Sequence, residues 1–283
     1  FLFDSKPASD YANTIVSDAM DTTVALGCRA IKVLNIWMWI VHKLNTMVDE
    51  CKNPTKDLNN MGMIDEAAAL WEGSQLFAMA ESNGPLFGHS QVGGMTYLNR
   101  KIVDRFVKAQ DIVSGNQNLC TNEDTHNLRI VVKETVSFMT AVLIQELIES
   151  MLKDSTTIKE KIEEAELMAF AVLPHIATCG HQAVYRQLYD ILITDGFDEA
   201  KLGDVITQLQ SNYNCLGLTC KDIGRSINDS SEHPECLENL DIAGYSPVNV
   251  TKTNMLAKLD LDAVAIHQLM VMDQHEVAKR IYM

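Results

Sequence analysis

Apolar residues recur every three or four positions along most of the chain, and one segment is apolar almost all round. Residues 128–152 carry apolar side chains on more than one helical stripe. Other helices surround a helix of this kind, because each apolar side needs a neighbour that excludes water. No segment has the alternation typical of a half-buried strand. The pattern predicts an all-α fold, a multi-helix bundle or array around a central helix at about 128–152.

The same spacing predicts helices on both sides of the central one. The pairs Thr121–Asp124 and Thr157–Glu160 have the spacing of capping boxes, which mark helix starts. Proline and glycine disfavour helix interiors, so they are expected to end or separate helices. The expected helices cover residues 10–49 (broken near Gly27), 62–82, 95–113, 158–173 (ended by Pro174), 180–194 and 198–211 (separated by Gly196).

Residues 31–44 form a second strongly apolar segment, which includes Trp37 and Trp39. We interpret it mainly as a second core helix, because apolar residues at helical spacing normally face a core. The alternative is a contact surface for another subunit. No transmembrane segment is expected here or at 128–152, because the uninterrupted apolar runs fall short of the roughly 20 residues that a span needs.

The whole chain, 1–283, is expected to form one helical unit. Its polar loop region begins at about 213 and ends at about 252. The unit divides into a main bundle at about 10–224, an exposed loop at 225–252 and a C-terminal helical pair at 253–283 that packs on a neighbouring unit. Because the helical pattern runs to Met283 without a cap, we expect the chain to be a piece of a longer protein.

Cysteine positions and two glycosylation triplets favour the secretory route. Cys28 lies in an apolar helical stretch, and we expect it to be a buried free thiol. The other cysteines are disulfide candidates whose pairing the sequence leaves open: Cys51, Cys120, Cys179, Cys215, Cys220 and Cys236. Asn228 and Asn249 begin acceptor triplets for N-glycans. Together these features predict a secreted, extracellular or cell-surface glycoprotein.

The chain is acidic, with 23 basic and 38 acidic residues and a formal net charge of −15. Nucleic acids and anionic membrane surfaces attract proteins with clustered Lys and Arg, so this balance argues against both partners. A surplus of acidic residues also keeps a protein soluble. The expected partner is another copy of the chain, in a homo-oligomer or in a tandem or fibrous assembly.

Acidic residues spaced three apart occur on two neighbouring helices. Glu146 and Glu149 lie on the central helix, and Glu160 and Glu163 lie on the next one. Residues three apart share a helix face, so two such pairs on facing helices can hold iron or another hard cation. We favour the competing interpretation of solvated helix faces, because no Glu-x-x-His motif accompanies the pairs.

No catalytic signature is found, and we expect no enzyme. There is no Gly-x-Ser-x-Gly elbow. Gly88 and Gly93 have P-loop spacing, but the Lys and Ser/Thr of that motif are missing. His175 and Cys179 are four apart and could share a metal, although Pro174 and a disulfide at Cys179 make this the less favoured interpretation. No cofactor is expected apart from N-glycans and, in the cation hypothesis, iron.

Several segments resemble a group of secreted diatom and other algal helical proteins. That group is related to the algal iron-assimilation and CO2-responsive periplasmic proteins. The resemblance implies a helical, secreted protein built of tandem units and associated with iron assimilation. The segments are YANTIVSDAMDTT (11–23), IDEAAALWEGS (64–74), AVLIQELI (141–148), FAVLPHIATC (170–179), YNCLGLTCKDIG (213–224) and LDLDAVAIHQLMVMDQHEVAKRIY (259–282).

Two functional hypotheses follow. The first is a non-enzymatic extracellular structural protein, a helical unit that associates with copies of itself into a cell-surface or fibrous assembly. The alternative is a periplasmic cation-binding protein, for iron in particular, that uses Glu146, Glu149, Glu160 and Glu163.

Overall fold

The computed structural model describes residues 2–3, 6–7, 10–52, 60–89, 91–114, 120–152, 157–179, 182–229 and 236. The chain divides into two compact units, Phe1–Pro234 and Glu235–Met283. The description below concerns the first unit. The predicted helical pair at 253–283 lies outside the described residues, as do residues 230–235 and 237–252 of the polar loop, which include Asn249.

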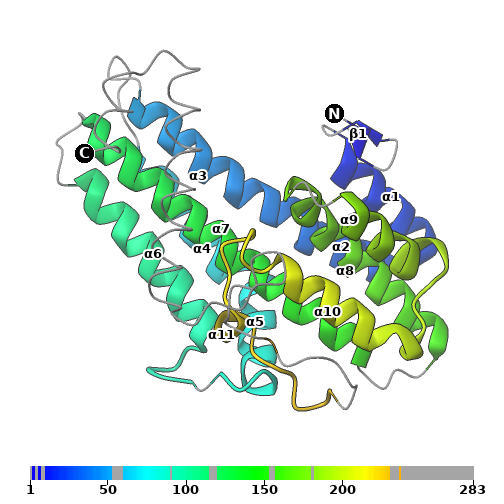
Figure 1. The fold of residues 1–283 in the computed structure, drawn as a ribbon. Coiled ribbons are helices and arrows are strands. Elements are labelled where there is room, and N and C mark those ends of the chain that lie inside the picture. The colour runs from blue at the N-terminus through cyan, green and yellow to red at the C-terminus, as the bar shows by residue number, and fades with distance from the viewer. Residues whose placement is uncertain are drawn as a thin grey trace. The chain divides into compact units, whose positions relative to one another are not determined.

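The first unit is built of helices, which confirms the predicted all-α fold (Figure 1). Its α-helices are α1 Tyr11–Thr22, α2 Val24–Ala30, α3 Ile36–Lys52, α4 Asn60–Glu72, α5 Gln75–Leu86, α6 Tyr97–Ser114, α7 Asn122–Leu152, α8 Ile158–Thr178, α9 Gln182–Tyr189, α10 Leu202–Asn212 and α11 Cys220–Ile223. Two π-helical turns, η1 Ile31–Asn35 and η2 Asp190–Thr194, and one 3-10 turn, η3 Glu199–Lys201, connect some of them. A hairpin of two-residue strands, β1 Leu2–Phe3 and β2 Lys6–Pro7, precedes α1 and was not predicted.

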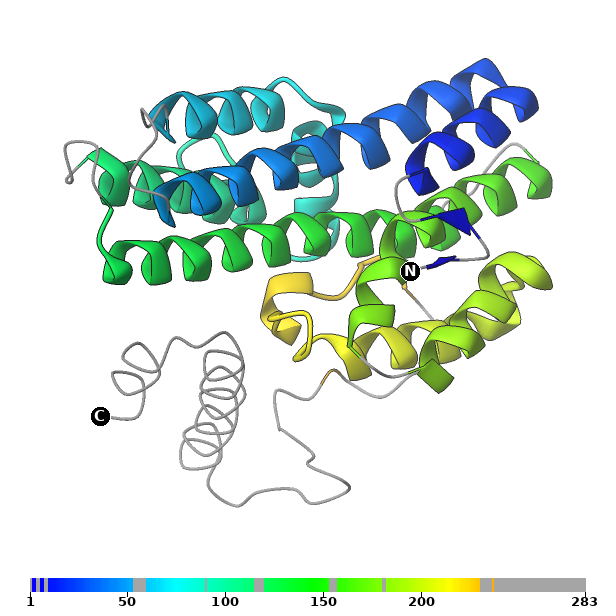
Figure 2. The same ribbon diagram turned by 90° about the horizontal axis from the view of Figure 1, so that it is seen from above.

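Helix α7 is the central element, as predicted, and it packs on α3, α5, α6, α8 and α11. Figure 2 shows it running alongside α3. The first half of α7 alternates between buried and exposed residues. From Met139 to Met151 every residue except Glu146 is buried. The nearly all-round apolar pattern therefore describes the second half, which the other helices enclose.

Two helix starts follow the predicted caps, and one expected helix divides. The Thr121 hydroxyl accepts from the Asp124 amide (3.1 Å), and the Asp124 carboxylate accepts from the Thr121 amide (2.8 Å). Thr157 likewise caps α8. The helix predicted at 62–82 divides into α4 and α5, because Ser74 caps the new start by accepting from the Phe77 amide.

The break predicted near Gly27 occurs instead at Thr23. The Thr23 side chain accepts from the Leu26 amide and so caps α2. Gly27 lies inside α2, where a Cβ atom would stand 2.3 Å from Cγ of Met20. The glycine therefore permits close approach of α1 and α2, and the N-cap residue ends α1.

Polar contacts hold the short helix α11 against α7, α6 and the loop that carries His89. Gln145 of α7 donates to the Ile223 carbonyl (2.7 Å), and the Tyr97 hydroxyl donates to Asp222 (2.8 Å). His89 Nε2 lies 3.0 Å from the Lys221 carbonyl oxygen, and burial lowers the pKa of His89. A helix of four residues is not stable alone, so these contacts keep it in place.

Two helical segments are long and apolar enough to cross a membrane by length and composition, Val24–Lys52 and α7. The first runs through α2, η1 and α3 without interruption, so the length argument against a span at 31–44 does not hold. Each segment contains an apolar stretch of 18 residues. The buried share of that stretch is 33% in Val24–Lys52 and 72% in α7. Buried core helices and signal sequences near the N-terminus satisfy the same criteria, and α7 is a buried core helix.

Candidate functional site

The predicted disulfide stapling is confirmed. Cys51 at the end of α3 bonds to Cys120 before α7 (Cα–Cα 5.4 Å), and Cys179 after α8 bonds to Cys215 (5.8 Å). Cys220 and Cys236 are disulfide-bonded as well. Disulfides persist in oxidising compartments, which points toward an extracellular environment. The expectation for Cys28 was wrong, since its free thiol is exposed and Gly27 takes the buried position beside it.

The carboxylate of Glu146 accepts hydrogen bonds in a polar cluster between helices. It accepts from Arg29 of α2 and from Asn83 Nδ2 of α5 (2.7 Å). Arg29 also pairs with Glu164 of α8 (2.9 Å). One guanidinium thus joins α2 to both α7 and α8, and the oxygens of Glu146 are occupied by protein donors.

Glu149 is buried and has partners different from those of Glu146. It accepts from the Ser226 hydroxyl and from Asn228 Nδ2 (3.3 Å). Ser226 is buried, so the start of the loop expected to be exposed at 225–252 packs on α7. Asn228 is exposed. Its side chain is therefore reachable at the predicted glycosylation position.

The other two predicted cation ligands lie near the start of α8. Glu163 forms an ion pair with Lys159 (3.5 Å), and Glu160 is exposed in the first turn. In the part of the chain that the structure describes, no three His, Cys, Asp or Glu side chains gather closely enough to hold a metal ion. The two pairs do not combine into one site, because each acidic side chain on α7 points to its own polar partners.

One face of the Val24–Lys52 helical segment is exposed although it includes apolar and aromatic residues. We define the Trp39 face as Val24, Cys28, Lys32, Trp39 and His42, all exposed. Trp39 keeps 51% of its surface exposed. His42 lies 5.6 Å from its ring, and the Lys43 ammonium group stands 5.2 Å above the ring centroid. Trp is enriched among the residues that anchor protein interfaces, and a cation near the ring face is attracted to it.

The charge of this segment is opposite to that of the chain. Val24–Lys52 contains Arg29, Lys32, Lys43 and Lys52 against Asp49 and Glu50, and both acidic residues lie in its last turn. Arg29 is committed to Glu146 and Glu164, and Lys43 pairs with Glu66. Lys32 forms no ion pair with any described residue and is exposed. The Trp39 face is therefore apolar with a positive edge, within a chain of net charge −15.

A pocket lies on the other side of the same segment, where two helices depart from regular α geometry. On one wall, η1 is a π-helical turn. On the other wall, α8 continues through Pro174 to Thr178 instead of ending there as predicted. Proline has no N–H to bond the carbonyl four residues earlier, and the Tyr11 hydroxyl donates to that Phe170 carbonyl instead (2.9 Å). A distant residue therefore stabilises the helix beyond its proline.

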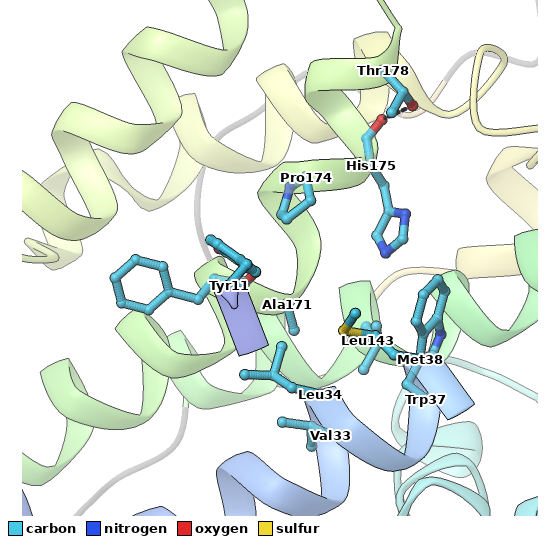
Figure 3. Close-up of a pocket in the computed structure, with 11 residues that line it drawn as sticks. Tyr11, Val33, Leu34, Trp37, Met38, Leu143, Ala171, Pro174, His175 and Thr178 are labelled. Atoms are coloured by element: carbon cyan, nitrogen blue, oxygen red, sulfur yellow. Dashed lines mark hydrogen bonds between the residues drawn. The ribbon is translucent and has the colours of Figure 1, made fainter. Parts of the chain in front are cut away.

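We name this the Trp37 pocket, with a volume of about 250 Å³. Val33, Leu34, Trp37, Leu143, Ala171 and His175 are among its lining residues. Figure 3 shows the His175 ring above the Trp37 ring, and their centroids are 4.6 Å apart. Burial lowers the pKa of His175 to about 4. The sequence suggested that His175 and Cys179 could share a metal ion. Cys179 is in a disulfide, so it offers no thiolate ligand for such a site.

Comparisons with protein-family models, with curated proteins and with solved structures gave no match.

Proposed function

We propose that this chain is a non-enzymatic extracellular structural protein whose copies associate through the Trp39 face. The observation that carries the proposal is the low burial of the segment that bears this face. Val24–Lys52 is more apolar than the core helix α7, yet only 33% of its most apolar window is buried. Exposed apolar surface of this kind marks an interaction site, because water contact with it is unfavourable.

A second copy of the chain suits this face because of its charge. The face has Lys32 and His42 at its edge and no acidic side chain, while the chain carries 15 more negative than positive charges. An acidic surface on one copy is thus complementary to the Trp39 face of the next. Contacts between two different surfaces of identical subunits continue into rings or open filaments. This agrees with the tandem-unit family that the sequence resembles.

Secretion, glycosylation and the algal relationship belong to the same proposal. The disulfides support an oxidising compartment. Exposure of Asn228 supports an N-glycan there, and replacing one of its two Nδ2 hydrogens leaves the other for Glu149. The alternative of an iron- or cation-binding protein has less support, because Glu146, Glu149 and Glu163 pair with protein groups in the described part of the chain.

The test is analytical ultracentrifugation of the secreted full chain over a range of concentrations. We expect reversible association that Trp39→Glu and Lys32→Glu weaken. Val107→Glu is the matched control, because Val107 lies on α6 and is 50% exposed against 51% for Trp39. Equal loss of association in Trp39→Glu and Val107→Glu would contradict the proposal.

The Trp39 face could instead be covered by the same chain or by a membrane surface, and each case gives its own result. A wild-type protein that stays monomeric, with Trp39 fluorescence shielded from a soluble quencher, indicates that the chain covers its own face. Flotation with vesicles of mixed neutral and anionic lipids, lost in Trp39→Glu, indicates a membrane surface. Either result overturns the proposal of a second copy.

A further inference from the structure

The Trp37 pocket contains polar groups that the protein leaves without partners. The Tyr11 hydroxyl is used by the Phe170 carbonyl, and the Thr178 hydroxyl donates to the His175 carbonyl (2.6 Å). Among the described residues, no hydrogen bond involves the His175 ring. The buried indole N–H of Trp37 also has no partner. Buried polar groups are normally paired, so the unpaired indole N–H of Trp37, beside the open ring of His175, points to a bound molecule.

The volume and the walls define the class of that molecule. A cavity of about 150 Å³ accommodates benzene, so about 250 Å³ has room for about two fused rings. No charged side chain lines the pocket, and an ionised ligand group would be desolvated without compensation. The ligand is therefore uncharged and hydrophobic.

His175 defines the position of one polar group on the ligand. A neutral imidazole offers one N–H donor and one nitrogen acceptor. Burial holds the pKa of His175 well below physiological pH, which keeps the ring neutral. A ligand hydroxyl or carbonyl that reaches this ring would gain a hydrogen bond that the protein does not supply.

We propose that the Trp37 pocket binds an uncharged hydrophobic molecule of about two-ring size, and that His175 hydrogen-bonds its single hydroxyl or carbonyl group. The site lies beside Trp37, on the side of Val24–Lys52 away from Trp39. It does not depend on self-association. Trp39→Glu is therefore expected to bind the ligand as the wild type does, so the two proposals can fail separately.

Equilibrium dialysis of the full chain against three probes tests the proposal. The probes are 2-naphthol, naphthalene without the hydroxyl, and 2-naphthoate with a charge. We expect 2-naphthol and naphthalene to bind one per chain and 2-naphthoate not to bind. In His175→Phe the affinity ratio of 2-naphthol to naphthalene is expected to fall about 2- to 10-fold, the effect of one neutral hydrogen bond.

A pair of alanine variants on α8 locates the binding. Ala171 is buried and lines the pocket, whereas Ala177 on the same helix is partly exposed and does not line it. Ala171→Leu fills the pocket and should abolish binding of both neutral probes, while Ala177→Leu should bind as the wild type. Circular dichroism checks that both variants fold. No binding of any probe, unchanged binding in a folded Ala171→Leu, or an unchanged probe ratio in His175→Phe would overturn the proposal.

Discussion

The two long apolar helices differ in what covers them. In α7, apolar residues lie all round the second half, and α3, α5, α6, α8 and α11 pack against the helix. In Val24–Lys52 the apolar composition is stronger, but Trp37 is buried in the pocket wall while Trp39, two residues later, is half exposed. Apolar composition shows that a helix needs cover. It does not show whether the same chain provides that cover.

The largest expected effect is the difference in unfolding free energy between a substitution in α7 and one on the exposed face of Val24–Lys52. Ile144 of α7 is fully buried, so Ile144→Ala removes packed atoms and leaves a cavity at a cost of about 2–5 kcal/mol. Trp39→Ala should change the unfolding free energy of the monomer by less than about 0.5 kcal/mol, as surface changes do. Urea unfolding at low protein concentration, with disulfides intact, measures both. Equal costs would show that the Trp39 face is covered within the monomer.

The next effect concerns pH and the buried side of Val24–Lys52. The folded pKa of His175 is about 4 and that of an unfolded His is about 6.5, so only the unfolded chain takes up this proton between those values. Stability is complete above about pH 6.5 and falls as the pH drops toward 4. Part of His175 is exposed, so the loss is at most about 3 kcal/mol.

The His175→Phe variant isolates this contribution. His89 also has a lowered pKa and acts in the same direction, but it is present in both proteins and cancels in the difference. Urea unfolding at pH 7 and pH 4 should show a smaller pH-dependent loss in the variant. The same loss in both proteins would mean that the His175 ring is not held neutral against Trp37.

The smallest effect tests how α8 passes Pro174. Tyr11→Phe removes the donor to the Phe170 carbonyl and should cost about 1 kcal/mol. In a Pro174→Ala background residue 174 regains its N–H and can bond this carbonyl, so the same Tyr11 change should cost clearly less. A double-mutant cycle from urea unfolding measures the difference. Equal costs in both backgrounds would show that the two groups do not substitute for each other.

The features predicted correctly from the sequence depend on local residues or on pattern. The central helix, the Thr121–Asp124 capping box and the helical fold follow from apolar spacing and from side-chain-to-backbone bonds within one turn. Cysteine composition similarly indicated disulfides. It did not indicate the pairing, because Cys51 and Cys120 meet only when α3 and α7 lie together.

The predictions for Pro174 and Gly27 were wrong because contacts between different helices decide both positions. Pro174 was expected to end its helix, but the Tyr11 hydroxyl, 159 positions from Phe170, donates to the Phe170 carbonyl that the proline leaves unbonded. Gly27 was expected to break a helix, but it makes room for Met20. The Trp37 pocket had no sequence signal of its own, because five helical elements contribute to it. Only the spacing of His175 and Cys179, considered as a metal pair, drew attention to that region.

The free thiol of Cys28 gives the most direct measurement of the central claim, because it is exposed on the Trp39 face. Its rate of reaction with a thiol reagent can be followed at low and at high protein concentration. In the wild type we predict fast labelling at low concentration. At high concentration we predict labelling that slows in proportion to the associated fraction. Trp39→Glu should label fast at both concentrations. A wild-type sample that is associated by ultracentrifugation, yet labels at the dilute rate, would contradict the claim that copies meet through this face.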